Sequence, residues 1–398
     1  MEKTIIGIWN GTVLPMAGGT FTRIPNGKVF VQDGKILAVG EEKLMPPELK
    51  GKEILWLDAQ GGIIMPGIIE AHCHMGITEE KKAMEGDDCN ENVNPVTPFL
   101  RAIDAINPMD AAFDDAVRAG ITCAMIGPGS SNVVGGQFAV VKTKGRCIED
   151  LVIKAPAAMK VAFGENPKVN FSGMGKSPCT RMAIAELSEA REYLRKKEKG
   201  DRDFETDFEK ECWIPVLKKE IPLKAHVHRA DDILTAIRIA KEFDLDMTLD
   251  HCSEGHLIAE KVAESGFPAI LGPDLSSRSK IEVQNMAFKT VGVLNRAGVK
   301  TAITTDHPVS LIQSLPLCAG LACKSGLPLE QAYLSITYYP ADILGVAERI
   351  GSLEPGKDAD IAVFTGNPME TFTDTLYTIL DGEIIYIRNE KEKVLKKC

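Results

Sequence analysis

The sequence has no long apolar run and no excess of positive charge, and both absences limit what the chain can do. No run reaches the roughly 18 apolar residues that a membrane-spanning helix needs. The formal net charge of −10 at pH 7 argues against nucleic acid or an anionic membrane surface as the main partner. The 398 residues are 44% hydrophobic and 26% charged, as in an ordinary soluble globular protein. We therefore expect a small-molecule substrate as the partner.

The cysteines also lack a pattern. The sequence has ten of them, and no two form a CxxC pair, which excludes a zinc ribbon and gives no sign of a disulfide framework. Scattered free thiols in a chain of this size are typical of a reducing compartment. The N-terminal stretch "MEKTIIGIWNGTVLPMAGG" has too short an apolar core for a signal peptide. We expect a cytoplasmic protein, and nothing in the sequence opposes a homo-oligomer.

The two ends of the chain show short strands separated by tight turns. "KVFVQDGKILAVGE" has two β-rich runs around Asp33-Gly34, and "LYTILDGEIIYIRNE" turns in the same way at Asp381-Gly382. Asp-Gly pairs suit the positive φ angles of tight hairpin turns. We predict that residues 1–61 and 348–398 form one smaller β-sandwich domain, built from both chain ends.

The middle of the chain, residues 62–347, alternates between strands and helices. Apolar strand-like runs such as "AAMKVAFG" and "FPAILGP" are separated by helical stretches, of which "DDILTAIRIAKEF" has the clearest helical period. Repeated alternation predicts parallel βα units in an α/β fold. About eight units fit a (β/α)8 TIM-like barrel, and an open parallel sheet is the alternative.

Histidine is scarce, yet its positions are not scattered. The chain has seven histidines, and six of them fall at the carboxyl ends of putative strands. In a parallel barrel these strand ends form the mouth of the active site. The segments concerned are "GIIMPGIIEAHCH" with His72 and His74, "IPLKAHVH" with His226 and His228, "DMTLDH" with His251, and "KTAITTDH" with Asp306 and His307.

The spacing of the first histidine pair indicates a metal site. Residues i and i+2 of a strand point to the same face, so His72 and His74 are directed at one point. Two neighbouring imidazoles repel each other once protonated, whereas neutral imidazoles are good ligands for a divalent cation. One histidine alone is more often an ordinary buried polar residue. The set as a whole predicts a metal centre.

These motifs resemble the amidohydrolase superfamily. The HxH strand, the later strand-end histidines, the aspartate of "TTDHP" and the closing "ERIGSLEPGKDADIAVFTGNP" are most similar to its imidazolonepropionase-related branch, and the likeness covers nearly the whole chain. The resemblance implies a metal-dependent hydrolase with one or two Zn²⁺ or other divalent ions. It implies ligands at His72, His74, His226, His251 and Asp306.

The fourth barrel strand leaves a choice between one metal and two. Many relatives bridge two metals with a carbamylated lysine, and some use a glutamate. Here Lys160 lies inside the strand "AAMKVAFGENPK" and Glu165 at its end. We predict Glu165 as the bridging ligand, because ligands gather at strand ends, with Lys160 as its rival. The alternative is that Glu165 has no role at the metal and only forms a turn or cap before Asn166-Pro167.

The resemblance also implies a mechanism. Bound Zn²⁺ lowers the pKa of its water to about 7. Asp306 is then the general base, taking the proton and passing it to the leaving group. His228 is left for substrate or transition-state contact, and Arg229 is a candidate partner for a substrate anion. The expected reaction is hydrolysis of a C–N bond in a small amide, cyclic amide or dipeptide-like molecule.

Two other functions remain open from the sequence. A deaminase would attack a ring amidine with the same metal water, but such enzymes place a glutamate close after the fifth-strand histidine, where this chain has "HVHRADD". The same absence weakens a strict imidazolonepropionase assignment. A scaffold barrel without catalysis is the alternative from another class. Such relatives usually lose ligands, and this chain keeps them.

Overall fold

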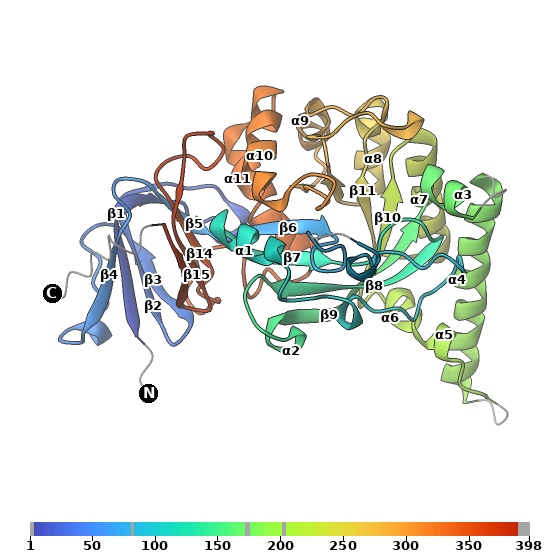
Figure 1. The fold of residues 1–398 in the computed structure, drawn as a ribbon, viewed down its shortest axis with the longest axis horizontal. Coiled ribbons are helices and arrows are strands. Elements are labelled where there is room, and N and C mark those ends of the chain that lie inside the picture. The colour runs from blue at the N-terminus through green and yellow to red at the C-terminus, as the bar shows by residue number, and fades with distance from the viewer. Residues whose placement is uncertain (1–3, 81–82, 172–175, 201–203, 389–398) are drawn as a thin grey trace.

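Two eight-stranded sheets form the framework of the protein (Figure 1). The computed structural model describes residues 4–80, 83–171, 176–200 and 204–388, so parts of both predicted terminal segments lie outside the described residues. One sheet, here called sheet A, belongs to a smaller domain, and the other, sheet B, curves into a nearly closed barrel. The predicted TIM-like barrel with a smaller β domain from both chain ends is confirmed.

Sheet A joins the two ends of the chain. Its strands run in the order β16-β15-β14-β5-β1-β2-β3, with β4 paired to β1. Both predicted hairpins are present, and their turns have positive φ at Asp33 and Asp381. The strands are β1 (Ile5–Val13), β2 (Ile24–Gln32), β3 (Lys35–Gly40), β4 (Ile54–Asp58), β5 (Ile63–Pro66), β14 (Ile361–Phe364), β15 (Thr375–Leu380) and β16 (Glu383–Ile387).

The chain passes from sheet A to the barrel at Gly67. We expected one strand from residue 62 to His74, and the structure divides it into β5, in sheet A, and β6 (Ile68–Cys73), in sheet B. A Cβ on residue 67 would lie 2.0 Å from Oγ1 of Thr122, so only glycine allows this close passage. The change of sheet therefore comes a few residues after the domain boundary suggested by the sequence.

Sheet B contains eight strands in chain order, and one of them is antiparallel. The loop 127–133 between β7 and β8 is too short for the crossover that a parallel connection needs, so β8 runs antiparallel to both β7 and β9. The other hydrogen-bonded neighbours are parallel. The strands are β6, β7 (Ile121–Ile126), β8 (Val134–Lys142), β9 (Val152–Ala162), β10 (Leu223–Val227), β11 (Met247–His251), β12 (Ala269–Leu271) and β13 (Thr301–Ile303).

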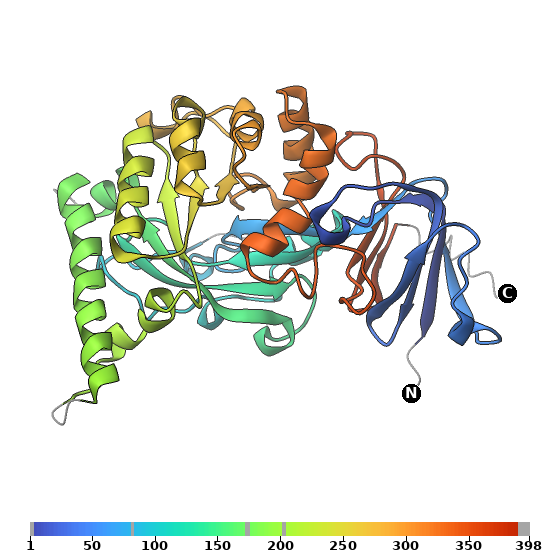
Figure 2. The same ribbon diagram turned by 180° about the vertical axis from the view of Figure 1, so that it is seen from behind.

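The helices from α7 onward cover the barrel strands on the side away from β8 and β9, whereas α2 and α6 lie on the same side as these two strands (Figures 1 and 2). The predicted apolar face of α7 is buried at Ile233, Ala236, Ile237 and Ala240. No helix within the described ranges is long and apolar enough to cross a membrane. The helices are α1 (Ala111–Arg118), α2 (Ile148–Leu151), α3 (Glu165–Asn170), α4 (Lys176–Lys199), α5 (Phe208–Glu211), α6 (Ile214–Leu217), α7 (Ala230–Phe243), α8 (Ala259–Ser265), α9 (Lys289–Arg296), α10 (Leu315–Lys324), α11 (Leu329–Ser335) and α12 (Tyr338–Ile343).

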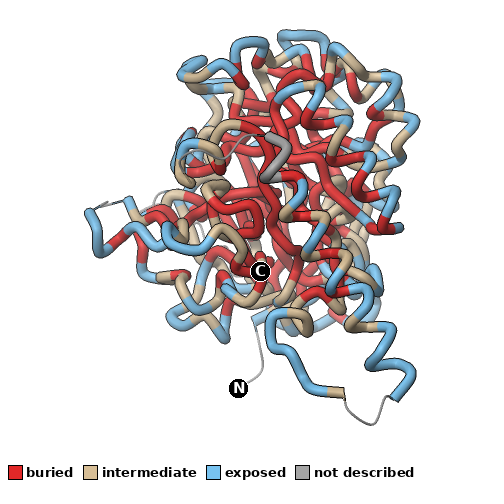
Figure 3. The backbone as a smooth tube through the Cα atoms, turned by 90° about the vertical axis from the view of Figure 1, so that its right-hand side faces the viewer, coloured by how far each residue is buried: buried red, intermediate tan, exposed pale blue. Residues whose placement is uncertain are grey.

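Burial is concentrated in the barrel strands, whereas the exposed residues lie on the outer turns and on the projecting end of α4 (Figure 3). All residues of β6, β7, β10 and β11 are buried. The largest apolar cluster spans the interface between barrel strands and helices, and a second one fills sheet A. Polar side chains inside the barrel therefore need a specific reason to be there.

A buried lysine links the barrel to the smaller domain. The Nζ of Lys142, on β8, lies 2.5 Å from Asp360 Oδ2 and 3.2 Å from both Asp358 Oδ2 and Asp381 Oδ1. Only 4% of the Lys142 side chain is exposed. Its ammonium group has therefore lost its contact with water, and three carboxylates take the place of the water. Burial raises the pKa of Asp360 to about 6, against the opposing effect of Lys142.

Replacing Lys142 by methionine should destabilise the protein by about 3–5 kcal/mol, because buried carboxylates lose their counter-charge. The matched control is Lys144→Met, whose partner Asp114 is exposed, and about 0–1 kcal/mol is expected there. Urea unfolding followed by circular dichroism measures both. Equal losses in the two variants would contradict the assigned role of Lys142.

Candidate metal centre

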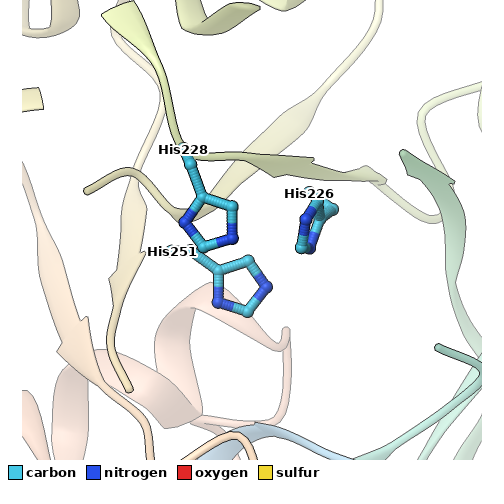
Figure 4. Close-up of side chains that lie close together, drawn as sticks. All are labelled: His226, His228 and His251. Carbon is cyan, nitrogen blue, oxygen red and sulfur yellow. The ribbon is translucent and has the colours of Figure 1, made fainter. Parts of the chain in front are cut away.

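The structure brings six of the predicted site residues together at the mouth of the barrel, and Glu165 is not among them. Three of the six lie on strands: His72 on β6, His226 on β10 and His251 at the end of β11. His74 and His228 directly follow strands, and Asp306 comes three residues after β13. Each of the six side-chain positions is at most 9% exposed, and they are His72, His74, His226, His228, His251 and Asp306. Figure 4 shows the rings of His226, His228 and His251 close together.

Their donor atoms form two overlapping groups. In the first, the donor atoms of His72, His251 and Asp306 lie within 4.8 Å of one another, and in the second the same holds for His226, His228 and His251. Oδ1 of Asp306 is 3.5 Å from Nε2 of His72 and 3.3 Å from Nε2 of His74. The two groups share His251, and each offers three donor atoms that could hold a metal ion.

Two of these residues reach the site through an unusual backbone conformation. His251 and Asp306 have φ angles of 69° and 53°. In regular strand geometry, Asp250 is the cross-strand partner of His226 and shares its face, so His251 would point away. The left-handed conformation redirects the side chain, at a cost of roughly 1–3 kcal/mol that is typical of functional sites.

Hydrogen bonds at Nδ1 orient four of the rings, so that Nε2 faces the cluster in each of them. For His74 and His251 the partner is a carbonyl oxygen, which can only accept, so Nδ1 is the donor. A neutral ring with Nδ1–H carries its lone pair on Nε2, the form that binds a metal. The pairs are His72 with Asp250 Oδ2 (2.7 Å), His74 with Gly127 O (2.7 Å), His251 with Gly272 O (2.7 Å) and His228 with Ser253 Oγ (2.8 Å).

Unsatisfied polar atoms show that a cation fits this cluster. Both ring nitrogens of His226, and Oδ1 of Asp306, are buried without a hydrogen-bond partner among the described residues. Leaving such groups unpaired costs roughly 1–3 kcal/mol each. Imidazole nitrogens and a carboxylate oxygen are a suitable donor set for zinc and similar divalent ions. The residues present therefore match the metal that the resemblance implies.

The electrostatics of the cluster favour neutral histidines. Burial lowers the pKa of His72, His226 and His251 well below the usual value, and it lowers that of His228 to about 4. His74 differs: burial opposes its protonation, but Cys89 and Asp306 raise its pKa to about 10. Nε2 of His74 and Oδ1 of Asp306, 3.3 Å apart, are two atoms that a cation could use.

The structure separates the two candidates on the fourth strand. Lys160 is fully buried, and its Nζ lies 3.4 Å from Nε2 of His72. Burial lowers its pKa to about 8. Glu165 begins α3 and is partly exposed, and among the described contacts none joins its carboxylate to a histidine. Lys160 is therefore brought into the cluster, whereas Glu165 lies beside it.

Arg229 lies at the start of α7, outside the histidine cluster. Its Nε donates to Oδ1 of Asp231 at 3.1 Å, and 45% of its side chain is exposed. The charge of the guanidinium is therefore paired with that of Asp231. Arg229 follows His228 in the chain, and its contact with a substrate stays a prediction.

Two acidic residues of the site escaped prediction from the sequence. Asp250 is fully buried and accepts hydrogen bonds from Thr248 Oγ1 and His72 Nδ1, while Nζ of Lys224 lies 3.0 Å away. Glu282 is 2% exposed and comes from the loop after β12. The alternation of β11 could have indicated Asp250, because it shares a face with His226. No motif marks Glu282.

Asp250→Asn should weaken Zn²⁺ binding by about 10–100-fold, because His72 loses the carboxylate that orients its ring. Competition with a chromogenic chelator measures the affinity of the metal-free protein. Asp246→Asn, an exposed position just before the same strand, is the matched control and should bind as wild type does. Equal affinity in both variants would show that Asp250 does not support the site.

Comparisons with known proteins agree with this geometry. Residues 63–385 match the model of the amidohydrolase family. The chain is 26% identical to amidohydrolase tasK of Hapsidospora irregularis over 94% of its own length, but it spans only 42% of that protein. It is 22% identical to imidazolonepropionase of Yersinia pestis, covering 89% of this chain and 90% of that one.

Solved structures give the same assignment. An amidohydrolase from Thermotoga maritima MSB8 matches with a TM-score of 0.90 and 36% identity, over 96% of this chain and 100% of that one. Guanine deaminase of E. coli, at 16% identity and a TM-score of 0.56, shares the fold. Because the family model matches most of the chain, the chain belongs to the amidohydrolase family, whose enzymes hydrolyse carbon–nitrogen bonds.

Proposed function

We propose that this protein is a metal-dependent hydrolase that cleaves a C–N bond in a small amide, cyclic amide or dipeptide-like molecule. The supporting observation is the buried cluster of Nε2 atoms around the Asp306 carboxylate at the barrel mouth. Zinc is the proposed metal, with one or two ions per chain. His72, His74 and Asp306 would hold one ion, and His226 and His251 the other.

Lys160, rather than Glu165, is the better candidate to lie between the two positions. Its Nζ faces Nε2 of His72 inside the barrel, and its lowered pKa of about 8 leaves part of the amine uncharged near neutral pH. An uncharged amine is the form that reacts with carbon dioxide to give a carbamate. Glu165 is instead the first residue of α3, and its side chain is partly exposed rather than buried in the cluster.

Each residue then has a chemical task. A divalent cation bound here supplies Lewis acidity to the carbonyl and to water. Asp306, with Oδ1 lacking a hydrogen-bond partner within the described chain, accepts the proton of the attacking water and delivers it to the leaving nitrogen. His228, neutral because burial lowers its pKa to about 4, contacts the substrate carbonyl. Arg229 is placed to meet a substrate anion at the rim.

We propose a cytoplasmic location on the basis of the thiols. The cysteines that the structure describes are all free, which supports our proposal of a cytoplasmic location. Assembly into a homo-oligomer stays a prediction.

Zinc-loaded protein should release amine from members of a library of small amides, lactams and dipeptides, and chelation should abolish the activity. Asp306→Asn, assayed at saturating Zn²⁺, should lower kcat by about 10²–10⁴-fold, because it removes the proton acceptor. Asp244→Asn, at an exposed helix end, is the control. The proposal fails if loaded wild type attacks no C–N bond, or if Asp306→Asn stays fully active.

A further inference from the structure

A buried carboxylate faces the histidines from a loop that carries no recognised motif. Glu282 lies in the short 3-10 helix Ile281–Val283, which follows β12 and precedes α9. Its side chain is 3% exposed. Its Oε1 atom is 4.0 Å from Nε2 of His226 and 3.9 Å from Nε2 of His228. The cluster in Figure 4 therefore has an acidic neighbour.

The other oxygen of Glu282 is fixed by the backbone of the fourth-strand loop. The N–H of Glu165 donates to Oε2 at 2.7 Å. A Cβ on Gly164 would lie 2.4 Å from this same oxygen, and Gly164 has a φ of 92°. Glycine is thus required for the loop to approach the carboxylate. With Oε2 held in this way, Oε1 is directed at His226 and His228.

A lysine at the rim balances the charge of this carboxylate. Nζ of Lys280 lies 2.5 Å from Oε1 of Glu282, and it also donates to Asn166 Oδ1 at 2.7 Å. Lys280 is 25% exposed, so its ammonium group can return to water, whereas Glu282 cannot. His226, in contrast, has no hydrogen-bond partner for either nitrogen among the described residues. A cation bound at His226 would give a ring nitrogen of His226 a partner and would balance the charge of Glu282 when Lys280 moves into water.

We propose that Glu282 is a further ligand of the cation that His226 and His251 hold, an inference that rests on the proposed function. Zinc binds histidine nitrogen at about 2.0–2.1 Å and carboxylate oxygen at about 2.0–2.2 Å, so two ligands of one tetrahedral ion lie roughly 3.3–3.5 Å apart. Oε1 of Glu282 and Nε2 of His226 are 4.0 Å apart. A side-chain shift of roughly 0.6 Å therefore brings Glu282 to a ligand distance.

This proposal makes Lys280 a competitor of the metal. The ammonium group and the cation would use the same oxygen, Oε1, so the ion pair must open when the cation binds. If Glu282 is instead only a counter-ion for Lys280, removal of the lysine tightens binding of the cation only through lost charge repulsion, and the set of ligands stays the same. The Co²⁺ spectrum, which reports the ligands, therefore separates the two roles.

The test measures Zn²⁺ stoichiometry and affinity of the metal-free, full-length protein by chelator competition, with the visible spectrum of the Co²⁺-loaded protein as a second readout. Glu282→Gln should lower the affinity for one of the bound ions by about 100-fold or more, since loss of a group that only orients a ligand already lowers metal affinity by about 10–100-fold. Lys280→Met should raise the affinity for the same ion several-fold. Both variants should change the Co²⁺ spectrum.

Glu254→Gln is the matched control. Glu254 is also a buried carboxylate at the barrel mouth, with Oε2 bonded to the N–H of Ala230 and Oε1 to Asn285 Nδ2, both at 2.8 Å. It should leave affinity and spectrum unchanged.

The outcomes separate this inference from the proposed function. Wild type that binds no Zn²⁺ overturns the proposed function and the inference with it. Wild type that binds Zn²⁺, with a Glu282→Gln variant of the same affinity and spectrum, overturns the role of Glu282 alone. If Glu282→Gln does not fold, Lys280→Met decides, and unchanged or weaker binding, or an unchanged Co²⁺ spectrum, in that variant overturns the inference.

Discussion

The buried carboxylate of Glu70 connects the first and last strands of the barrel, and the site depends on this connection. Among the described strands, no backbone ladder joins β6 to β13. Instead, Oε1 of Glu70 accepts from Thr304 Oγ1 and His72 N–H, and Oε2 accepts from the N–H and Oγ1 of Thr305. His72 follows on one strand and Asp306 on the other. Together with the hydrogen bond from His74 N–H to His307 O, the clamp holds histidine and aspartate side by side at the candidate metal centre.

Around this clamp, the barrel interior pairs Asp250 with a lysine and keeps all the cluster histidines except His74 neutral. Asp250 lies between His72 and Lys224, and Lys160 is the cross-strand partner of Lys224. Burial lowers the pKa of both lysines, as it does for the histidines of the cluster. Neutral imidazoles and nearby carboxylates together form a donor set suited to a divalent cation.

The positions of the histidines could be predicted because strand periodicity and strand ends are visible in a sequence. His72 and His74 needed no more than this, whereas the choice of His226 over His228 as a ligand needed the family resemblance. His251 and Asp306 were predicted from their places at strand ends and from the resemblance, and left-handed backbone turns, which the sequence does not show, aim them at the site. The antiparallel β8 was not foreseen, because it depends on the short loop before it.

Side chains that come from distant loops were harder to predict. Glu165 attracted attention because it follows a strand, yet Gly164 turns the chain there and Glu165 opens a helix. Lys160 lies on the inward face of β9, which is set by its register with Lys224. Glu282 is near the histidines only because the loop after β12 folds back over the barrel mouth, a tertiary fact without a local signal.

The central claim is that the strand-end cluster binds a divalent metal. The most direct test is a crystal structure of the Zn²⁺-loaded protein with anomalous data collected on both sides of the zinc edge. The account predicts an anomalous peak about 2.0–2.2 Å from Nε2 of His72 and His74 and from the carboxylate of Asp306. Fully loaded crystals with no peak at these atoms would contradict it.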